Sequence, residues 1–302
     1  MPDPLISIVI PCYNQACFLG EAVESIFSQT CLDFEVTVVD DGSTDDSADV
    51  AARYPGVQII QQENRERGAA RNAGLCRGHG RYLVFLDADD RLLPTALESG
   101  LNYLKPHPEY GFVSGYVKLI ANDGVSLGVP EESCINTDHY AALLRYNYIW
   151  TTAAVMFRRD ALEAVRGFDT RLGITGAEDW DLYLRIARRF PAYCHGEVVA
   201  EYRLHKKNTV RNSARMLKHS LTVLRSQRTY LKGNHQYEEA FKFGVKQAQE
   251  YYGEPLADEI RDHLRALKWK RAIQNMIMLL RLSTWLRKAF FAESYLTAPR
   301  LK

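Results

Sequence analysis

The chain has 302 residues, of which 46% are hydrophobic and 25% are charged, as in a globular protein with a large buried core. No uninterrupted apolar run reaches the ~18–20 residues that a bilayer-spanning helix needs, and the cysteines show no C-x-x-C or His/Cys spacing typical of a metal site. The net charge of +1 hides an asymmetry: residues 1–200 hold 17 Lys/Arg and 28 Asp/Glu, whereas residues 201–302 hold 21 and 9. The basic C-terminal third suggests an anionic partner, which could be nucleic acid, a membrane surface or the acidic part of the same chain.

Apolar runs alternate with helical patterns over the first 108 residues. The runs predict buried strands at 5–11, 34–40, 57–62 and 81–87. The intervening helical patterns cover 18–29, 43–54, 67–78 and 93–108. This alternation predicts an α/β fold with a mostly parallel sheet and helices on both faces. Ligands of such sheets bind at the carboxyl ends of the strands.

The pattern loosens from about residue 111. Further strands are expected at 110–120, 151–159 and 197–205, with helices at 159–168 and 178–190. After about residue 212 the chain is helical and basic, without convincing strands.

The strongest local signal is "FLDADD", in which Asp87, Asp89 and Asp90 follow a buried strand. Three neighbouring carboxylates repel one another, and burial adds a desolvation penalty, so a positive group is expected to compensate. Carboxylates on such a turn suit a hard divalent cation. The alternative is that Asp89 and Asp90 only cap a following helix.

Three weaker signals accompany it. In "VVDDGSTD", Asp40 or Asp41 could accept hydrogen bonds from a base or ribose, or could form an Asx turn. In "ENRERGAARNAG", Arg67 and Arg71 on a helix start favour phosphate, unless they are solvated surface residues. In "TGAEDWDLYLRIA", an acid at the helix start could be a general base, or could only offset the helix dipole.

Five motifs taken together resemble the family 2 glycosyltransferases of GT-A fold over roughly residues 5–210. They are "SIVIPCYN", "VVDDGSTD", "ARNAG", "FLDADD" and "EDWDLYLR" in this order. The resemblance implies a Rossmann-like α/β catalytic domain at 1–212, followed by a helical basic region at 213–302. No G-x-G-x-x-G follows the first strand, which disfavours a dinucleotide-binding domain.

The resemblance also implies roles for individual residues. Pro11 and Tyr13 would flank the nucleotide base, Asp40 with Asp41 would contact it, and Arg71 would lie near the nucleotide. The D-x-D motif, Asp87-Ala88-Asp89, would bind ribose and metal, with His205 near the metal or diphosphate. Asp179 would be the general base. Glu66 stands where many members have glycine, so we expect the local turn to differ.

The reaction implied is inverting transfer from a nucleotide-sugar, with UDP the expected nucleotide, to a hydroxyl of a glycan or lipid-linked acceptor. A divalent metal, Mn²⁺ or Mg²⁺, would be the cofactor, and the product a cell-surface polysaccharide or glycolipid. Two alternatives stay open: a nucleotidyltransferase, or a catalytically silent GT-A-like module that binds or scaffolds. The N-terminus has no signal-peptide pattern, and free thiols fit a cytoplasmic location.

The segment 261–291 holds eight Lys/Arg and a single acid, Asp262. Its apolar residues Trp269, Ile273, Met276, Ile277, Leu280 and Trp285 could line one side of a helix or helix pair. Such a helix suits an anionic membrane surface, which would place the protein on the inner face of the cell membrane. The equal alternative is packing on the catalytic domain or on a second subunit of a homo-oligomer. No nucleic-acid-binding module is visible.

Overall fold

The computed structural model describes residues 4–131, 135, 137–205, 208 and 212–282. The chain divides into two compact units, which are described separately below. The first consists of Met1–Leu143 with Asn147–Lys206, and the second of Leu144–Tyr146 with Lys207–Lys302.

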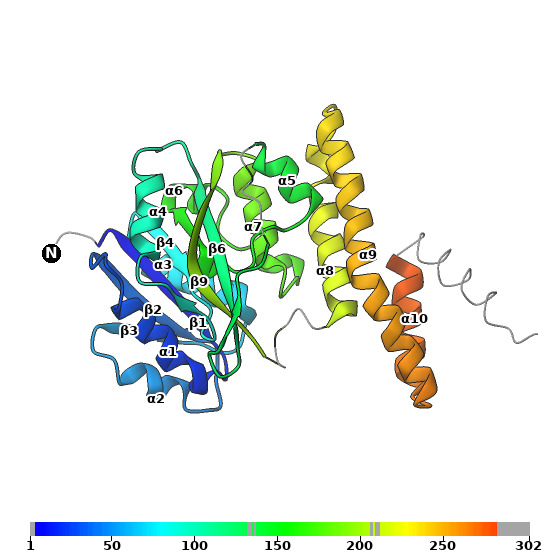
Figure 1. The fold of residues 1–302 in the computed structure, drawn as a ribbon, viewed down its shortest axis with the longest axis horizontal. Helices are drawn as coiled ribbons and strands as arrows, with labels where there is room; N and C mark the ends of the chain where they lie inside the picture. The colour runs from blue at the N-terminus through cyan, green and yellow to red at the C-terminus, as the bar shows by residue number, and fades with distance from the viewer. Residues whose placement is uncertain (1–3, 132–134, 136, 206–207, 209–211, 283–302) are drawn as a thin grey trace, which may run out of the picture. The chain divides into compact units, whose positions relative to one another are not determined.

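Nine strands of the described residues form one sheet in the first unit (Figure 1). They are β1 (Ile6–Cys12), β2 (Phe34–Asp40), β3 (Val57–Gln61), β4 (Tyr82–Phe85), β5 (Arg91–Leu92), β6 (Phe112–Ala121), β7 (Ser126–Gly128), β8 (Val155–Arg158) and β9 (Ala192–Leu204). Their order across the sheet is β3-β2-β1-β4-β8-β6-β9-β5, and β7 pairs with β6. The expected sheet is therefore present, with two short strands, β5 and β7, that the sequence pattern did not predict.

The first four strands run parallel, as their continuous hydrophobicity predicts. Cys12 of β1 pairs in register with Asp40 of β2, and Val9 with Phe85 of β4. The carboxyl ends of β1, β2 and β4 therefore meet at one edge of the sheet. Beyond β4 the sheet is mixed: β8 is antiparallel to both β4 and β6, and β9 is parallel to β6 but antiparallel to β5.

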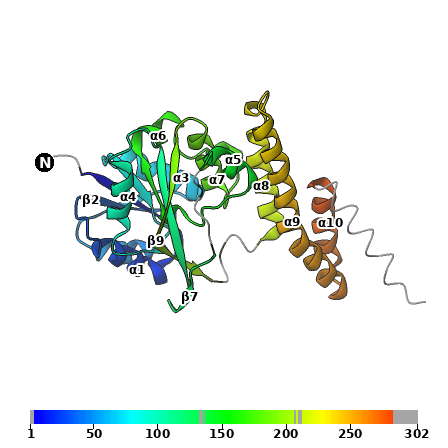
Figure 2. The ribbon, with the colours of Figure 1, turned by 45° about the horizontal axis from the view of Figure 1, so that its top comes forward.

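Seven helices among the described residues accompany these strands along the chain (Figure 2). They are α1 (Ala16–Phe27), α2 (Ser47–Ala52), α3 (Glu66–Arg77), α4 (Ala96–Leu104), α5 (His139–Arg145), α6 (Arg159–Ala164) and α7 (Glu178–Ala187). Alternate strand residues point to opposite faces, so Ile8 and Val84 pack with α1 and α4 in one core. On the other face, Phe157 stacks on Tyr183 of α7. Both faces of the sheet are thus covered.

Helix α3 packs closely on β1. A side chain at Gly74 would meet Val9 at 2.2 Å, so only glycine fits there. This close approach fixes α3 against the parallel strands, and its first two turns then lie beside the carboxyl ends of β1 and β4.

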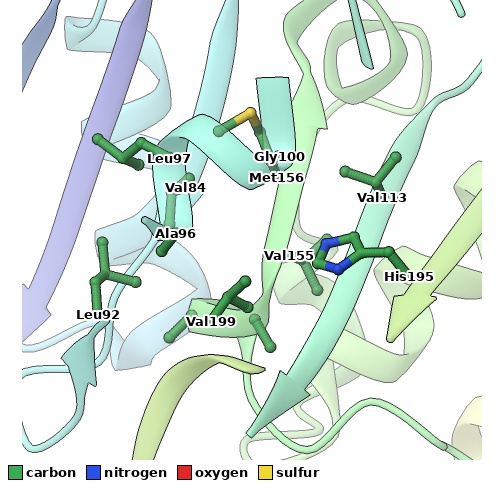
Figure 3. Close-up of a pocket in the computed structure, with 12 residues that line it drawn as sticks. Val84, Leu92, Ala96, Leu97, Gly100, Val113, Val155, Met156, His195 and Val199 are labelled. Atoms are coloured by element: carbon green, nitrogen blue, oxygen red, sulfur yellow. The ribbon is translucent and has the colours of Figure 1, made fainter. Parts of the chain in front are cut away.

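A small apolar cavity lies inside the first unit, between α4 and the strands β4, β6, β8 and β9 (Figure 3). Its lining is apolar apart from His195, and includes the thioether of Met156, as Figure 3 shows. His195 Nδ1 accepts a hydrogen bond from the backbone N–H of Glu197 at 3.3 Å, and burial lowers the pKa of this imidazole. His195 is therefore a neutral core residue, and the cavity has no polar group arranged for catalysis.

The second unit contains three long helices among its described residues: α8 (Ser213–Ser226), α9 (His235–Arg265) and α10 (Trp269–Leu282). Asn212 and Asn234 cap α8 and α9, each accepting a hydrogen bond from a backbone N–H three residues on. Helix α9 packs against both α8 and α10. The helical C-terminal region expected from the sequence is present as far as residue 282, and Trp285, Arg287 and Lys288 lie outside the described residues.

Candidate active site

The turn that follows β4 carries Asp87, Asp89 and Asp90. One ligand oxygen from each lies within 4.8 Å of the others. Asp87 and Asp89 are partly exposed, and Asp90 is buried. The cluster predicted from "FLDADD" is therefore formed at the edge where the parallel strands end.

Two arginines of α3 supply positive charge to Asp87. Arg71 Nη2 donates to Asp87 Oδ1 at 2.6 Å, and Arg67 Nη1 lies 3.6 Å from Oδ2. Burial alone would raise the pKa of Asp87, but Arg71 and then Arg67 outweigh it and hold this pKa below its usual range. Asp87 is therefore ionised, with both oxygens directed at α3.

The same arginines reach Glu178 at the start of α7. Arg71 Nη1 donates to Glu178 Oε1 at 2.9 Å, and Arg67 Nε lies 3.3 Å from that oxygen. Arg71 is only 2% exposed, and its guanidinium also lies 5.2 Å from the ring centre of Phe168. Four charged residues therefore join the end of β4 to the start of α7. We call them the ion-pair quartet: Arg67, Arg71, Asp87 and Glu178.

Asp179 follows directly on Glu178 and is partly buried. Burial, followed by the neighbouring Glu178 carboxylate, raises its pKa to about 7, against the opposing effect of Arg71, the Trp180 N–H and Arg67. A carboxylate that titrates near neutrality is suited to accept a proton at physiological pH. The quartet thus places a basic carboxylate next to the aspartate turn.

The end of β9 holds the other side of that turn. The Arg203 backbone N–H donates to Asp90 Oδ1 at 3.0 Å, and Thr151 Oγ1 donates to Asp90 Oδ2 at 2.9 Å. Arg203 Nε donates to the Asp89 carbonyl at 2.9 Å, and His205 Nε2 lies 2.8 Å from Asp89 Oδ2. Burial, and then the charges of Asp89 and Asp87, raise the pKa of Asp90.

The donor set of the turn fits a divalent cation. Asp87 already faces two arginines, and both oxygens of Asp90 accept hydrogen bonds inside the protein. Asp89 and His205 offer a carboxylate oxygen and an imidazole nitrogen side by side, and an oxygen of Asp87 lies within 4.8 Å of one on Asp89. Mg²⁺ and similar ions commonly take one or two carboxylates and complete their shell with water and substrate phosphates.

The two acids at the end of β2 accept hydrogen bonds from the loops that follow β2 and β3. Asp40 Oδ1 accepts from the Ser43 N–H at 2.9 Å, which is the expected Asx-type turn. Asp41 Oδ1 accepts from Gln62 Nε2 at 2.6 Å and from the Arg65 N–H at 2.9 Å. Both acids are buried at the same strand edge as the aspartate turn. Their contact with a nucleotide stays a prediction.

The remaining predicted site residues differ in accessibility. Pro11 lies within β1, and Tyr13, at the end of that strand, is 47% exposed, so its ring has a free surface. Ala88 is buried in the apolar core, and its contact with a ligand stays a prediction.

Sequence reasoning assigned no role to Glu178 or Arg203 and left that of Arg67 open. Arg71 and Glu178 lie 107 positions apart, so no local pattern announces their pairing. At Glu66, where many family members have glycine, φ is 71°, in the region that favours glycine. That this turn differs from the family's stays a prediction.

Comparison with known proteins agrees with this geometry. Residues 7–166, more than half of the chain, match the family described as glycosyl transferase family 2. Chondroitin synthase of Escherichia coli is 32% identical over 225 residues, which are 68% of this chain and 30% of that protein. The chain thus spans about a third of that relative.

Two solved structures show the same fold. The Staphylococcus aureus TarS 1–349 complex with UDP superposes with a TM-score of 0.61 at 19% identity, over 82% of this chain and 72% of that one. Pyrobaculum calidifontis mannosyltransferase PcManGT, in complex with GDP-Man and Mn²⁺, superposes with a TM-score of 0.59 at 19% identity, over 94% and 88%. The fold and site therefore define a glycosyltransferase of GT-A type. The chain belongs to glycosyl transferase family 2.

Proposed function

We propose that the protein transfers a sugar from a nucleoside diphosphate sugar, with UDP as the nucleotide, to a hydroxyl group of a growing glycan, with inversion at the anomeric carbon. The observation that carries this proposal is the bridge made by Arg71. Its guanidinium donates to Asp87 on the turn that suits the donor and metal, and to Glu178, the neighbour of Asp179. Donor and base are therefore expected at one strand edge.

The transfer step needs a proton acceptor on the side of the incoming hydroxyl. The acceptor oxygen attacks the anomeric carbon, the bond from that carbon to the diphosphate oxygen breaks, and Asp179 takes the hydroxyl proton. A single displacement of this kind inverts the anomeric configuration. Since the pKa of Asp179 is raised to about 7, the carboxylate can be ionised at neutral pH and still be a useful base.

Asp89 and His205, with Asp87 beside them, would hold a divalent cation. Such an ion neutralises the charge that develops on a departing diphosphate. Arg203 and Thr151 keep the turn that carries these ligands in place through Asp89 and Asp90.

The nature of donor and acceptor is supported by what related proteins are named for. The two structures of similar fold are complexes with UDP and with GDP-Man and Mn²⁺. Chondroitin synthase supports a polysaccharide acceptor, and hence a role in cell-surface polysaccharide assembly.

The assignment of Asp179 is tested by Asp179→Asn, with Asp181→Asn as the matched control. Asp181 lies on the same helix but pairs with Arg185 at 2.7 Å, outside the site. We expect Asp179→Asn to lower turnover by about 10²–10⁴-fold, with the dissociation constant of the donor nucleotide unchanged. Asp181→Asn should lower the melting temperature and keep turnover. Turnover can be followed as release of nucleoside diphosphate, and binding by calorimetry.

The reverse result would contradict the assignment. If Asp179→Asn lost donor binding but kept normal turnover at saturating donor, Asp179 would be a binding residue, and the base would lie elsewhere.

A further inference from the structure

Helix α10 exposes a row of large apolar side chains. It buries Ala272 and Leu279, while Trp269, Ile273 and Ile277 are 55%, 48% and 44% exposed. A spacing of four residues places the three on one face of the helix. Leu267, in the turn before α10, is 70% exposed. We call Leu267, Trp269, Ile273 and Ile277 the apolar stripe.

The turn that presents Leu267 is strained. Its φ of 55° lies in the left-handed region, which is unfavourable for a residue with a side chain. The Lys268 N–H donates back to the His263 carbonyl at 2.8 Å and closes this turn. This is the left-handed C-cap that commonly ends a helix, with a leucine where glycine is usual, and it leaves Leu267 exposed beside α10.

The stripe is bordered by cations that have no acidic partner in the part of the chain that the structure describes. Lys268, Lys270 and Arg271 are exposed and form no ion pair with a described residue. Residues 263–282 contain no Asp or Glu. On the preceding helix α9, by contrast, Arg261 and Arg265 lie beside Asp258 and Asp262. The change from paired to unpaired cations coincides with the beginning of the stripe.

We propose that the apolar stripe and its basic border dock the protein on an anionic phospholipid surface. The apolar side chains would enter the boundary between headgroups and acyl chains, while Lys268, Lys270 and Arg271 would meet lipid phosphates. Among the described residues no helix has the length and hydropathy to cross a bilayer. In this arrangement the stripe lies on the bilayer surface. Docking of this kind does not depend on the sugar transfer proposed above.

Charge favours a membrane over a second copy of the chain. A two-fold interface brings the same patch of each subunit together, so the two basic borders would face each other and repel. An anionic bilayer instead offers many negative headgroups, each lysine or arginine near the surface contributing favourably.

The test is co-sedimentation of the full chain with two kinds of vesicle. One is pure phosphatidylcholine, which is neutral overall, and the other contains roughly 30% phosphatidylglycerol, which makes its surface anionic. The stripe variant is Trp269→Ser/Ile273→Ser. Its control is Tyr251→Ser, at an aromatic on α9 that is even more exposed, at 73%. The charge variant is Lys268→Glu/Lys270→Glu, and Lys242→Glu/Lys246→Glu, with the same change of net charge, is its control. All substituted positions are exposed, so folding should be unaffected.

We expect the wild type to bind the anionic vesicles. The stripe variant and the charge variant should each lower the partition coefficient about tenfold or more, and the two controls should bind like the wild type. Absence of vesicle binding by the wild type, or equal binding by all variants, would overturn the proposal. A wild-type dimer in sedimentation velocity that becomes monomeric in Trp269→Ser/Ile273→Ser would overturn it in favour of a subunit interface.

Discussion

The aspartate turn and helix α10 use charge in opposite ways. Around the turn, each charged side chain has a partner within the chain, either of opposite charge or as a hydrogen-bond donor. These side chains are Asp87, Asp90, Arg71 and Glu178. On α10 and in the turn before it, the cations have no acidic partner among the described residues; they are Lys268, Lys270 and Arg271. Buried charges must be paired to be tolerated, and such pairing also fixes their geometry for a ligand. Exposed cations are stable without partners, because water solvates them. Stability of the fold therefore does not explain why they cluster beside exposed apolar side chains, whereas docking on an anionic surface does.

The largest difference between the two regions should appear in stability. Arg71→Met leaves Asp87 and Glu178 without their main buried partner, and breaking such a pair costs about 3–5 kcal/mol. Lys270→Met removes an exposed cation that forms no ion pair with a described residue, and it should change the free energy of unfolding by less than about 0.5 kcal/mol. Urea denaturation of the two variants measures both values. Equal losses would show that the quartet does not stabilise the fold.

Arg203 should have an effect specific to the metal ligands. We expect Arg203→Lys to weaken Mn²⁺ binding about tenfold, since Nε no longer holds the Asp89 carbonyl, and residues that orient ligands typically contribute 10–100-fold. Arg159→Lys is the matched control, because Arg159 also holds backbone carbonyls, those of Gly80 and Leu75, at the opposite edge of the sheet.

Electron paramagnetic resonance of free Mn²⁺ measures affinity without turnover, and thermal melting reports the structural cost. Both variants should melt at lower temperature, while only Arg203→Lys should lose affinity. Equal Mn²⁺ affinities in the two would contradict a positioning role for Arg203.

The pH profile tests the coupling between the quartet and Asp179. Because the base acts when ionised and its pKa is about 7, kcat/KM should fall as pH drops below 7. Glu178→Gln removes the negative neighbour that raises this pKa, so the acid limb should move to lower pH by about one unit. A limb that stays in place would show that another group controls it.

The smallest effect is expected at Glu66. The φ of Glu66 is 71°, which glycine adopts without the penalty of a side chain. Relief of this strain in Glu66→Gly should raise the free energy of unfolding by up to about 1 kcal/mol. Loss of the hydrogen bond from Thr175 to Glu66 Oε2 should offset part of that gain. Glu63→Gly, at an exposed neighbour in the same loop, is the control. A clear destabilisation by Glu66→Gly alone would mean that the side-chain contact outweighs the strain.

Sequence reasoning succeeded where a local pattern determines the structure. Strands β1, β2 and β4 follow from continuous apolar runs, and the acids at their ends follow from the order of the motifs. The two-residue β5 could not be predicted, because its pairing with β9 joins Arg91 to Glu201 across the fold. The positive charge required by the aspartates was predicted, but not that Arg67 and Arg71 would supply part of it from α3.

We expect the turn after β4 to bind a nucleoside diphosphate together with a divalent cation. Titration calorimetry of UDP, GDP and dTDP into the protein, with Mn²⁺ and with EDTA, tests it most directly. We predict that UDP binds in the presence of Mn²⁺ and that its binding is lost or strongly weakened in EDTA. If none of the three nucleotides bound under either condition, the aspartate turn would be a structural cap and the protein a module of GT-A fold without donor-binding activity.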